Sequence, residues 1–398
     1  MTDPAQPSRI VVTSRLYEPE PSAATFRIAA LARALADDHE VTVLTTRPPA
    51  GSVAPASDER ITVSRARVLR DRSGAIRGYV QYASFDGPLF FRLLARRADA
   101  VVAEAPPTTG LVSLVAARLR RACFVYYPGD VWTDGVIAMG ASRSVIALMR
   151  WMESFVLRRA DAVLAVSPEV GERLERLGAR HDRVVEVGNG VDTEVFRPDV
   201  DPPEHERPYF VYTGTMSEWQ RPEIFVEALA LLGDAAADVE LRFFGQGTAE
   251  ADVRDAAERL LPARVHFGGV VSPAESARWI RGAVGALVSI VPGVGYDFAR
   301  PTKTYAAAAT GTPVLYAGAA AGAMVVADAG LGETADFTAD SVAAAMQRLL
   351  EQNANGRSDA LRQERARWAR DNVSLAAVGR RAADAVQSTL TGGRRAAR

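Results

Sequence analysis

Residues 298–318 read FARPTKTYAAAATGTPVLYAG. A Pro-Thr-Lys entry is followed by a run of alanines that favours a helix, and then by a Gly-Thr-Pro turn and the apolar residues 314–317. A loop, helix, turn and strand at this spacing predict one α/β unit. Lys303 falls in the first turn of the predicted helix, where free backbone N–H groups and the helix dipole favour an anion. The stretch therefore predicts a phosphate site, with Tyr305 at the same helix start.

Length and composition limit the number of domains and the classes of function to be considered. A chain of 398 residues is long for one domain, so we expect two. Hydrophobic residues at 48%, charged residues at 24% and a net charge of -1 are ordinary for a soluble protein and give no global attraction to nucleic acid. Cys123, the single cysteine, is expected to be a small core residue, and the four histidines show no metal-ligand spacing.

The polar start MTDPAQPSR lacks the features of a signal peptide, and no run reaches the roughly 18 apolar residues of a membrane span. We therefore expect a cytoplasmic protein.

The first half alternates strands and helices in the doubly wound pattern. Residues 9–14 and 41–45 are predicted strands that flank a helix at 23–36, and further strands are predicted at 61–63, 101–103, 124–127, 162–166 and 184–187. Polar residues such as Glu104, Asp130 and Trp132 follow strand ends, which would line one crevice. The first loop contains no Gly-x-Gly-x-x-Gly, which argues against an ordinary NAD enzyme.

A segment dense in proline and charge, residues 197–208, predicts an inter-domain linker. We interpret Asp199 and Asp201 as solvated linker residues rather than metal ligands. From residue 209 the alternation restarts, with strands predicted at 209–213, 239–244, 265–271 and 286–291. The expected fold class is α/β, with two Rossmann-like doubly wound halves.

Seven segments in this order carry a family resemblance: AALARALADDHEVTVLTT, SPEVGERL, GNGVDTEVFRP, YTGTMSEWQRPEIFVEAL, FFGQGT, RVHFGGVV and ARPTKTYAAAATGTPVL. Together they resemble the retaining glycosyltransferases of the GT-B fold, family four, over nearly the whole chain. EAPPTTG and YYPGDVWTDGVIAMG further resemble the subgroup that builds bacterial surface polysaccharides. The subgroup's Asp-x-Trp-Pro-Glu pattern is matched in part by Asp130, Trp132 and Asp134.

The resemblance implies two Rossmann-like domains facing across a cleft. These are an acceptor domain at 1–196, the linker at 197–208, a donor domain at 209–372, and a C-terminal helix at 373–398 that returns to the first domain. It also implies metal-independent, cofactor-free transfer of a hexosyl or N-acetylhexosaminyl group from a nucleotide diphosphate sugar. The acceptor would be a glycan, a lipid-linked molecule or a natural product, and no nucleic acid partner is implied.

The resemblance also implies site residues. Arg221 and Lys303 would contact the diphosphate, and an arginine keeps that role plausible because guanidinium binds phosphate bidentately. Arg221 could instead be a surface residue at a helix start. The base would lie near Gly269 and Val270. The expected donor-binding set is Gly214, Thr215, Arg221, Gly269, Val270, Asp297, Thr302, Lys303 and Tyr305.

In the first half, Asp130 would lie beside the reacting sugar as the catalytic residue, and Glu104 and Trp132 would contact the acceptor. Each carboxylate could equally make a capping or structural hydrogen bond.

Two positions depart from the family pattern. Alignment through Lys303 places Phe298 and Ala306 where the family usually has two glutamates, the second of which holds the ribose hydroxyls. Neither side chain can accept a hydrogen bond. This keeps an alternative open, a catalytically silent GT-B partner or binding subunit. An epimerase on the same fold is disfavoured, because the second half has no clear carboxylate and histidine set.

Residues 88–97 and 141–159 mix apolar and aromatic residues with arginines. Such surfaces predict peripheral contact with the inner face of the plasma membrane, or else helices that pack on the sheet with snorkelling arginines.

Overall fold

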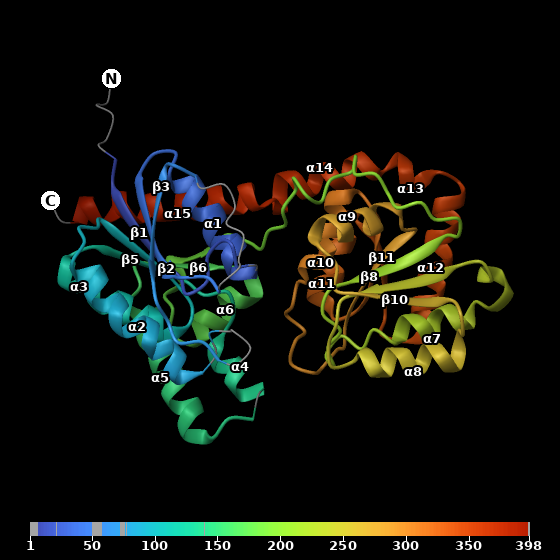
Figure 1. Ribbon diagram of the computed structural model, residues 1–398, viewed down its shortest axis with the longest axis horizontal. Coiled ribbons are helices and arrows are strands. Elements are labelled where there is room, and N and C mark those ends of the chain that lie inside the picture. Colours follow the sequence, from blue (N-terminus) through green and yellow to red (C-terminus); the bar gives the residue numbers. More distant parts are fainter. Residues whose placement is uncertain are drawn as a thin grey trace. The chain divides into compact units, whose positions relative to one another are not determined.

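The computed structural model describes residues 7–20, 22–49, 58–71, 76, 78–138 and 140–396, which form two compact units. The described residues up to Asn189, together with those from Leu375 onward, make unit 1, and Gly190–Ser374 make unit 2. Each unit is a parallel sheet flanked by helices (Figure 1). The doubly wound α/β class predicted from the sequence is confirmed.

Unit 1 contains a seven-stranded sheet in the order β3-β2-β1-β4-β5-β6-β7. Its elements are β1 Arg9–Thr13, α1 Ala23–Leu35, β2 Glu40–Thr46, β3 Ile61–Ala66, α2 Tyr79–Leu94, β4 Ala100–Glu104, α3 Pro107–Arg120, β5 Cys123–Tyr127, α4 Trp132–Ala138, α5 Arg143–Arg159, β6 Ala162–Ala165, α6 Pro168–Arg176, the 3₁₀ turn His181–Arg183, β7 Val184–Glu186 and α15 Leu375–Ala396. The central strands β1, β4 and β5 contain runs of buried apolar residues because helices cover both faces of the sheet.

Local signals place the unit 1 helices. Ser22 caps α1 by accepting a hydrogen bond from the Thr25 N–H at 3.0 Å. The last helix, α15, packs against α1 (Figure 1), and its residues Val378, Ala382 and Val386 are buried. Arg381 Nε donates to the Val187 carbonyl at 2.9 Å. Helix α15 is thus part of the core of unit 1.

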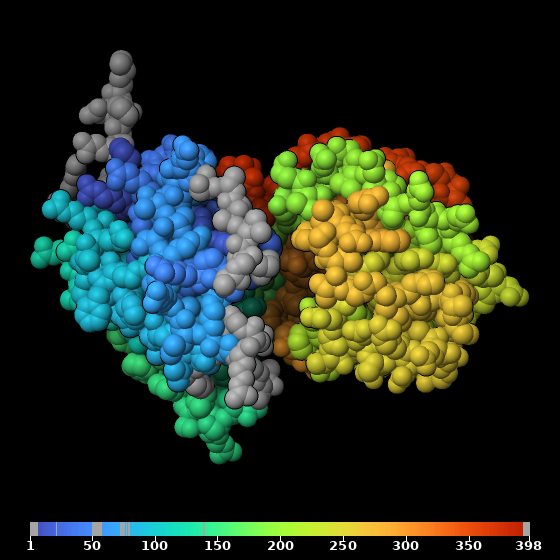
Figure 2. Space-filling view, in the orientation of Figure 1, coloured from blue at the N-terminus to red at the C-terminus, as the bar shows by residue number. Residues whose placement is uncertain are grey.

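Unit 2 contains a six-stranded parallel sheet in the order β10-β9-β8-β11-β12-β13. Its elements are β8 Tyr209–Thr213, α7 Ile224–Leu231, the 3₁₀ turn Gly233–Ala236, β9 Glu240–Phe244, α8 Glu250–Leu260, β10 Val265–Gly269, α9 Pro273–Gly282, β11 Gly285–Ile290, α10 Thr302–Thr310, β12 Val314–Gly318, α11 Ala320–Asp328, β13 Gly332–Ala335, α12 Ala339–Ala354, α13 Arg357–Ala360 and α14 Arg362–Val373. In Figure 2 the yellow surface of unit 2 includes α8.

The stretch at 298–318 forms α10 and β12 as predicted. The alanine run lets α10 pack closely in an apolar cluster with β11 and β12, since methyl groups leave little volume between helix and sheet. The next helix and strand, α11 and β13, were not predicted. β13 reads Gly-Glu-Thr-Ala and forms an edge of the sheet, so it lacks the apolar run that identifies a buried strand.

The proline-rich segment is held against unit 2 rather than standing apart from it. Arg278 Nε donates to the Asp201 carbonyl at 3.0 Å, and Arg281 Nε donates to the Pro198 carbonyl at 2.7 Å. Unit 2 begins at Gly190, before the linker that the sequence suggested. Within the described ranges, no helix is long and apolar enough to cross a membrane.

Candidate functional site

In unit 2, three loops meet at the carboxyl edge of the sheet. Gly214 N–H donates to the Phe244 carbonyl at 2.8 Å, and Gly245 N–H donates to the Gly269 carbonyl at 2.7 Å. A Cβ on Gly245 would lie 2.0 Å from the Gly214 carbonyl oxygen, and φ there is +129°, so only glycine fits. Gly214 and Gly269, both named from the sequence, therefore belong to one surface that is formed mainly by backbone atoms.

Lys303 joins this surface from the N-terminus of α10. Its Nζ lies 3.7 Å from the centroid of the Tyr212 ring and donates to the Thr215 carbonyl at 3.4 Å. A Cβ on Gly214 would lie 3.8 Å from the same Nζ. Desolvation lowers the pKa of Lys303 to about 7. The structure thus brings Gly214, Thr215 and Lys303 together.

Tyr212 is a site residue that sequence reasoning missed. Its ring supports the Lys303 ammonium, and its hydroxyl lies 2.7 Å from Gln220 Oε1 and 2.8 Å from the Thr215 carbonyl oxygen, which compete for its one proton. The signal was its place near the end of β8, directly before the Gly214 turn. Tyr212 therefore holds the loop and the cation in one arrangement.

Arg221 lies at the far end of the same loop. It adopts a left-handed backbone conformation with φ +43°, and its Nε donates to Glu223 Oε1 at 2.8 Å. This bond raises the pKa of Arg221. Its role on the diphosphate stays a prediction, since the guanidinium already engages a neighbouring carboxylate.

The remaining donor residues are spread over the edge. Thr302 is exposed as the first residue of α10, and Val270 is exposed directly after Gly269. Asp297 Oδ1 accepts from the Gly293 N–H at 2.8 Å within its own loop. Tyr305 is instead buried in the cluster beneath α10, with its ring 6.4 Å from that of Trp368.

The two positions that depart from the family pattern, Phe298 and Ala306, lie among aromatic and apolar residues. Ala306 is buried in the apolar cluster beneath α10. Phe298 stacks on Tyr296 at 6.3 Å, and Tyr296 stacks on Trp219 at 4.7 Å. These rings join the loop after β8 to the loop after β11, so an aromatic contact holds the two loops together.

In unit 1, the carboxyl edge is built from charged side chains. Glu104 ends β4, is buried, and accepts a hydrogen bond from Ser14 Oγ at 3.3 Å. Burial raises the pKa of Glu104 to about 7, opposed by the charges of Arg27 and Arg15 and reinforced by Asp130. Asp130 reaches the surface, yet partial desolvation raises its pKa while Arg27 lowers it. Glu104 and Asp130 thus belong to one electrostatic group.

Trp132 is positioned by a carboxylate that the sequence did not single out. Glu153 of α5 is fully buried and accepts from the N–H groups of Trp132 and Thr133, both at 2.9 Å, and from Thr133 Oγ1 at 2.5 Å. It therefore caps the N-terminus of α4 from outside the helix. The Trp132 ring lies edge-on to Tyr82 at 6.1 Å. Only the tertiary fold brings Glu153 to this helix.

Arg15 and Arg27 complete the unit 1 edge and were also missed. Arg15 follows β1, and Arg27 lies among the buried residues of α1. A detectable signal existed for Arg27, because a charged residue between Thr25 and Ile28 interrupts an otherwise apolar helix face.

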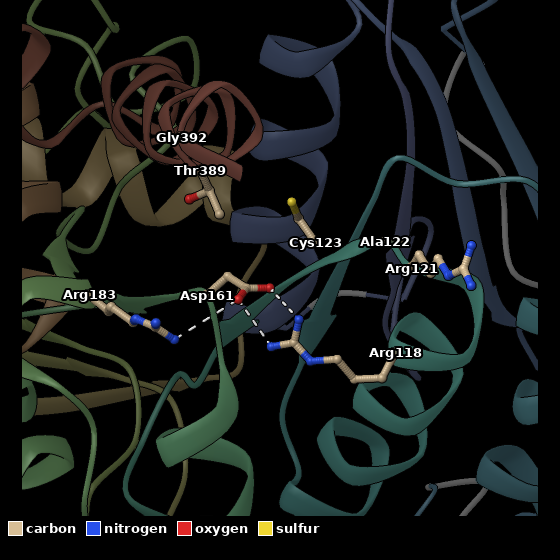
Figure 3. Close-up of a pocket in the computed structure, with 8 residues that line it drawn as sticks. All are labelled: Arg118, Arg121, Ala122, Cys123, Asp161, Arg183, Thr389 and Gly392. Carbon is tan, nitrogen blue, oxygen red and sulfur yellow. Dashed lines mark hydrogen bonds and ion pairs between the residues drawn. The ribbon is translucent and has the colours of Figure 1, made fainter. Parts of the chain in front are cut away.

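A cavity of about 470 Å³ lies at the opposite, amino edge of the unit 1 sheet (Figure 3). Arg118 and Arg183 point to Asp161 in it, and half-buried Cys123 lines one side. The cavity is distant from strand ends that carry predicted site residues, because Cys123 opens β5 and Asp161 precedes β6. Among the residues described, no cluster of three or more His, Cys, Asp or Glu could hold a metal ion.

Two family models match the chain in succession. Residues 22–190 match the glycosyl transferase 4-like domain, and residues 207–352 match the glycosyl transferases group 1 domain. A search of curated protein sequences finds no significant match.

Solved structures resemble the whole chain. Sucrose-phosphate synthase from Thermosynechococcus elongatus is 17% identical with a TM-score of 0.70, covering 98% of this chain and 100% of that chain. Anabaena HepE in complex with UDP and glucose is 15% identical with a TM-score of 0.67, covering 96% and 100%. WaaG, a glycosyltransferase involved in lipopolysaccharide biosynthesis, is 17% identical with a TM-score of 0.64, covering 94% and 98%. At these identities the likeness establishes the fold.

Proposed function

Because the chain belongs to the glycosyltransferases of the GT-B fold, we propose that it is a retaining, metal-independent enzyme that uses a nucleotide diphosphate sugar. It transfers a hexosyl or N-acetylhexosaminyl group and needs no cofactor. The observation that carries this proposal is the Lys303 ammonium beside the Gly214 turn at the start of α10. That arrangement suits a leaving diphosphate.

The chemistry follows from charge. As the bond from the anomeric carbon to the diphosphate breaks, negative charge grows on the leaving oxygen. The N–H groups at the start of α10 and Lys303 stabilise it. An approaching diphosphate restores the protonated form of Lys303, whose pKa is about 7 without it. The cation therefore interacts more strongly as the charge develops.

Retention follows a front-face route. The acceptor hydroxyl approaches the anomeric carbon on the side from which the diphosphate leaves, and its proton passes to a leaving phosphate oxygen. The new carbon–oxygen bond then has the configuration of the old one, and no side-chain nucleophile is required. Asp130 of unit 1 is the residue that we propose beside the reacting sugar, with Glu104 and Trp132 on the acceptor.

Structural relatives support a uridine nucleotide as the first donor to try, because HepE was crystallised with UDP and with UDP-glucose. WaaG acts in lipopolysaccharide biosynthesis, which supports a bacterial surface glycan or its lipid-linked precursor as the product.

We also propose that unit 1 contacts the membrane from the cytoplasmic side. Helices α2 and α5 both pack against α3 (Figure 1). The three helices expose Phe91, Leu119, Leu148 and Trp151. The one acidic residue of α5, Glu153, is buried, whereas Arg143, Arg150, Arg158 and Arg159 are exposed. An apolar and purely cationic helix surface suits anionic lipid headgroups.

The test is a panel of UDP-, GDP- and dTDP-sugars. At least one donor should raise the melting temperature of the wild type, and Lys303→Met should abolish that shift while remaining folded. The anomeric configuration of the product, read by NMR, should equal that of the donor. An inverted product would refute retention, and no shift with any donor would count against the proposal as a whole.

The silent alternative rests on Phe298 and Ala306 and makes a distinct prediction. A silent protein would bind a donor without hydrolysing it or transferring its sugar, even over many hours at high protein concentration. Measurable slow hydrolysis of the bound donor, lost in Lys303→Met, would exclude the silent protein.

A further inference from the structure

Two arginines at the carboxyl edge of unit 1 are buried, and some of their N–H groups have no hydrogen-bond acceptor. Arg15 and Arg27 are 9% and 8% exposed. Arg15 Nε and Nη1, and Arg27 Nε, have no hydrogen-bond partner. Buried guanidinium N–H groups normally have hydrogen-bond acceptors. We therefore expect an oxyanion, or ordered water in its place, to accept hydrogen bonds from these groups.

Aromatic rings hold Arg15 in place without using its donors. Its guanidinium carbon lies 3.9 Å from the centroid of the Tyr82 ring and 5.9 Å from that of Trp132. Thr46 Oγ1 fixes its backbone by donating to the Arg15 carbonyl at 2.8 Å. A contact between a ring and a guanidinium face does not use the N–H groups, which lie in the guanidinium plane, so these can still donate to an acceptor.

Arg27 is brought to the same edge by a glycine. A Cβ at Gly129 would lie 2.0 Å from Arg27 Nη2, so any other residue would displace the guanidinium. Gly129 directly precedes Asp130, the proposed catalytic residue. Arg27 therefore lies beside the loop where we place the reacting sugar.

The nearby acids do not neutralise these cations by contact. Across the described part of the chain, neither arginine forms an ion pair within 4.0 Å. Glu104 accepts from Ser14, and Asp86 accepts from Thr109 Oγ1 at 2.6 Å. Burial raises the pKa of both carboxyls. The edge thus contains two permanent cations and acids whose pKa values burial raises.

We propose that Arg15 and Arg27 form a phosphate-recognition site in unit 1, so that the acceptor of this enzyme carries a phosphoryl group. Two guanidinium forks match the several oxygens of a phosphate. The assignment to the acceptor rests on the proposed function, whereas the anion site itself does not.

The first experiment is calorimetric titration of the full chain with inorganic phosphate. Wild type should bind at millimolar concentration or below, and Arg15→Gln and Arg27→Gln should each weaken binding tenfold or more. The matched control is Arg97→Gln, an exposed arginine of the same unit, which should bind as wild type does. Arg15→Lys and Arg27→Lys should fall between, because charge remains and the fork is lost. Circular dichroism and melting temperature check that each variant folds.

A second arm separates the acceptor from the donor. Wild type should bind glucose 6-phosphate at least tenfold more tightly than glucose. Arg15→Gln should lose this preference for the phosphorylated sugar. UDP affinity should be unchanged in Arg15→Gln and roughly ten- to hundredfold weaker in Lys303→Met. Absence of phosphate binding, or equal binding by all the arginine variants, would overturn the site. A parallel loss of UDP affinity in Arg15→Gln would assign the anion to the donor and overturn the acceptor assignment. Failure of the donor panel with phosphate binding intact would reject the proposed function alone.

Discussion

The carboxyl edges of the two sheets share a topology and differ in what they are made of. In unit 2 the surface is mainly backbone, with the loops of Gly214, Gly245 and Gly269 bonded to one another and Lys303 laid over them. In unit 1 it is mainly side chains, with Arg15, Arg27 and Glu104 packed among aromatic rings. Backbone N–H groups suit an invariant ligand such as a diphosphate, whereas side chains can be exchanged to suit different acceptors.

The largest expected effect tests the backbone-built edge. Gly245→Ala should lower the free energy of unfolding by about 3 kcal/mol or more, because the new methyl group would overlap the Gly214 carbonyl and φ is positive. Urea denaturation measures this. Gly135→Ala in α4, where a Cβ would meet no atom within 4 Å, is the control and should change stability little. Similar effects of the two substitutions would contradict the close loop packing.

The second effect tests the side-chain edge. In the folded state Glu104 binds a proton up to about pH 7, whereas the unfolded chain releases it near 4.5. Glu104 therefore stabilises the fold fully below pH 4.5, and this contribution is lost as pH rises through 7, by about 3 kcal/mol. Glu104→Gln should remove that pH dependence, so the difference between variant and wild type should grow from pH 5 to pH 8. A pH-independent difference would contradict the raised pKa.

The third effect concerns Lys303. Its folded pKa of about 7 lies below its ordinary value of 10.5, so UDP binding above pH 7 must restore a proton. UDP affinity should fall by up to about tenfold per pH unit between pH 7 and pH 9. Lys303→Met should weaken UDP binding roughly ten- to hundredfold at pH 7 and flatten the pH dependence. Calorimetry in buffers of different ionisation enthalpy would detect the proton uptake, and an equal pH slope in both proteins would disprove it.

The smallest effect on stability concerns the helices outside both edges. Trp151→Ala and Leu148→Ala should each change stability by less than about 0.5 kcal/mol, since both side chains are exposed. They should nevertheless reduce sedimentation with phosphatidylglycerol vesicles several-fold. Leu231→Ala, an equally exposed residue of unit 2, is the control. Unchanged vesicle binding in the α5 variants would remove the membrane proposal.

Patterns local in sequence explain what could be predicted about the fold. The strands were recognisable because apolar runs in a buried parallel sheet need no knowledge of their partners, and α10 because alanines follow a Pro-Thr-Lys entry. The edge strand β13 escaped detection because its partly exposed residues do not have to be apolar. Gly214 and Lys303, which lie close together in the structure, could be named as candidates because the turn and the helix start each have a short sequence signature.

Contacts between distant segments explain what could not be predicted. Glu153 caps α4 from α5, and Arg27 reaches Gly129 from α1, so no spacing along the chain connects either pair. The Tyr305 ring lies 6.4 Å from that of Trp368 in the apolar cluster beneath α10, and this contact depends on which face of α10 its neighbours bury.

The sequence alone determined the alternation of strands and helices, the two doubly wound halves and the glycine and lysine signature at 298–318, because each follows from residue preferences over one or two elements. Only the tertiary structure decided the protonation of Lys303 and Glu104 and the unpaired donors of Arg15 and Arg27. In each case the physical cause is the burial of a charged or titratable group. Burial depends on every segment packed around the group rather than on its neighbours in the chain.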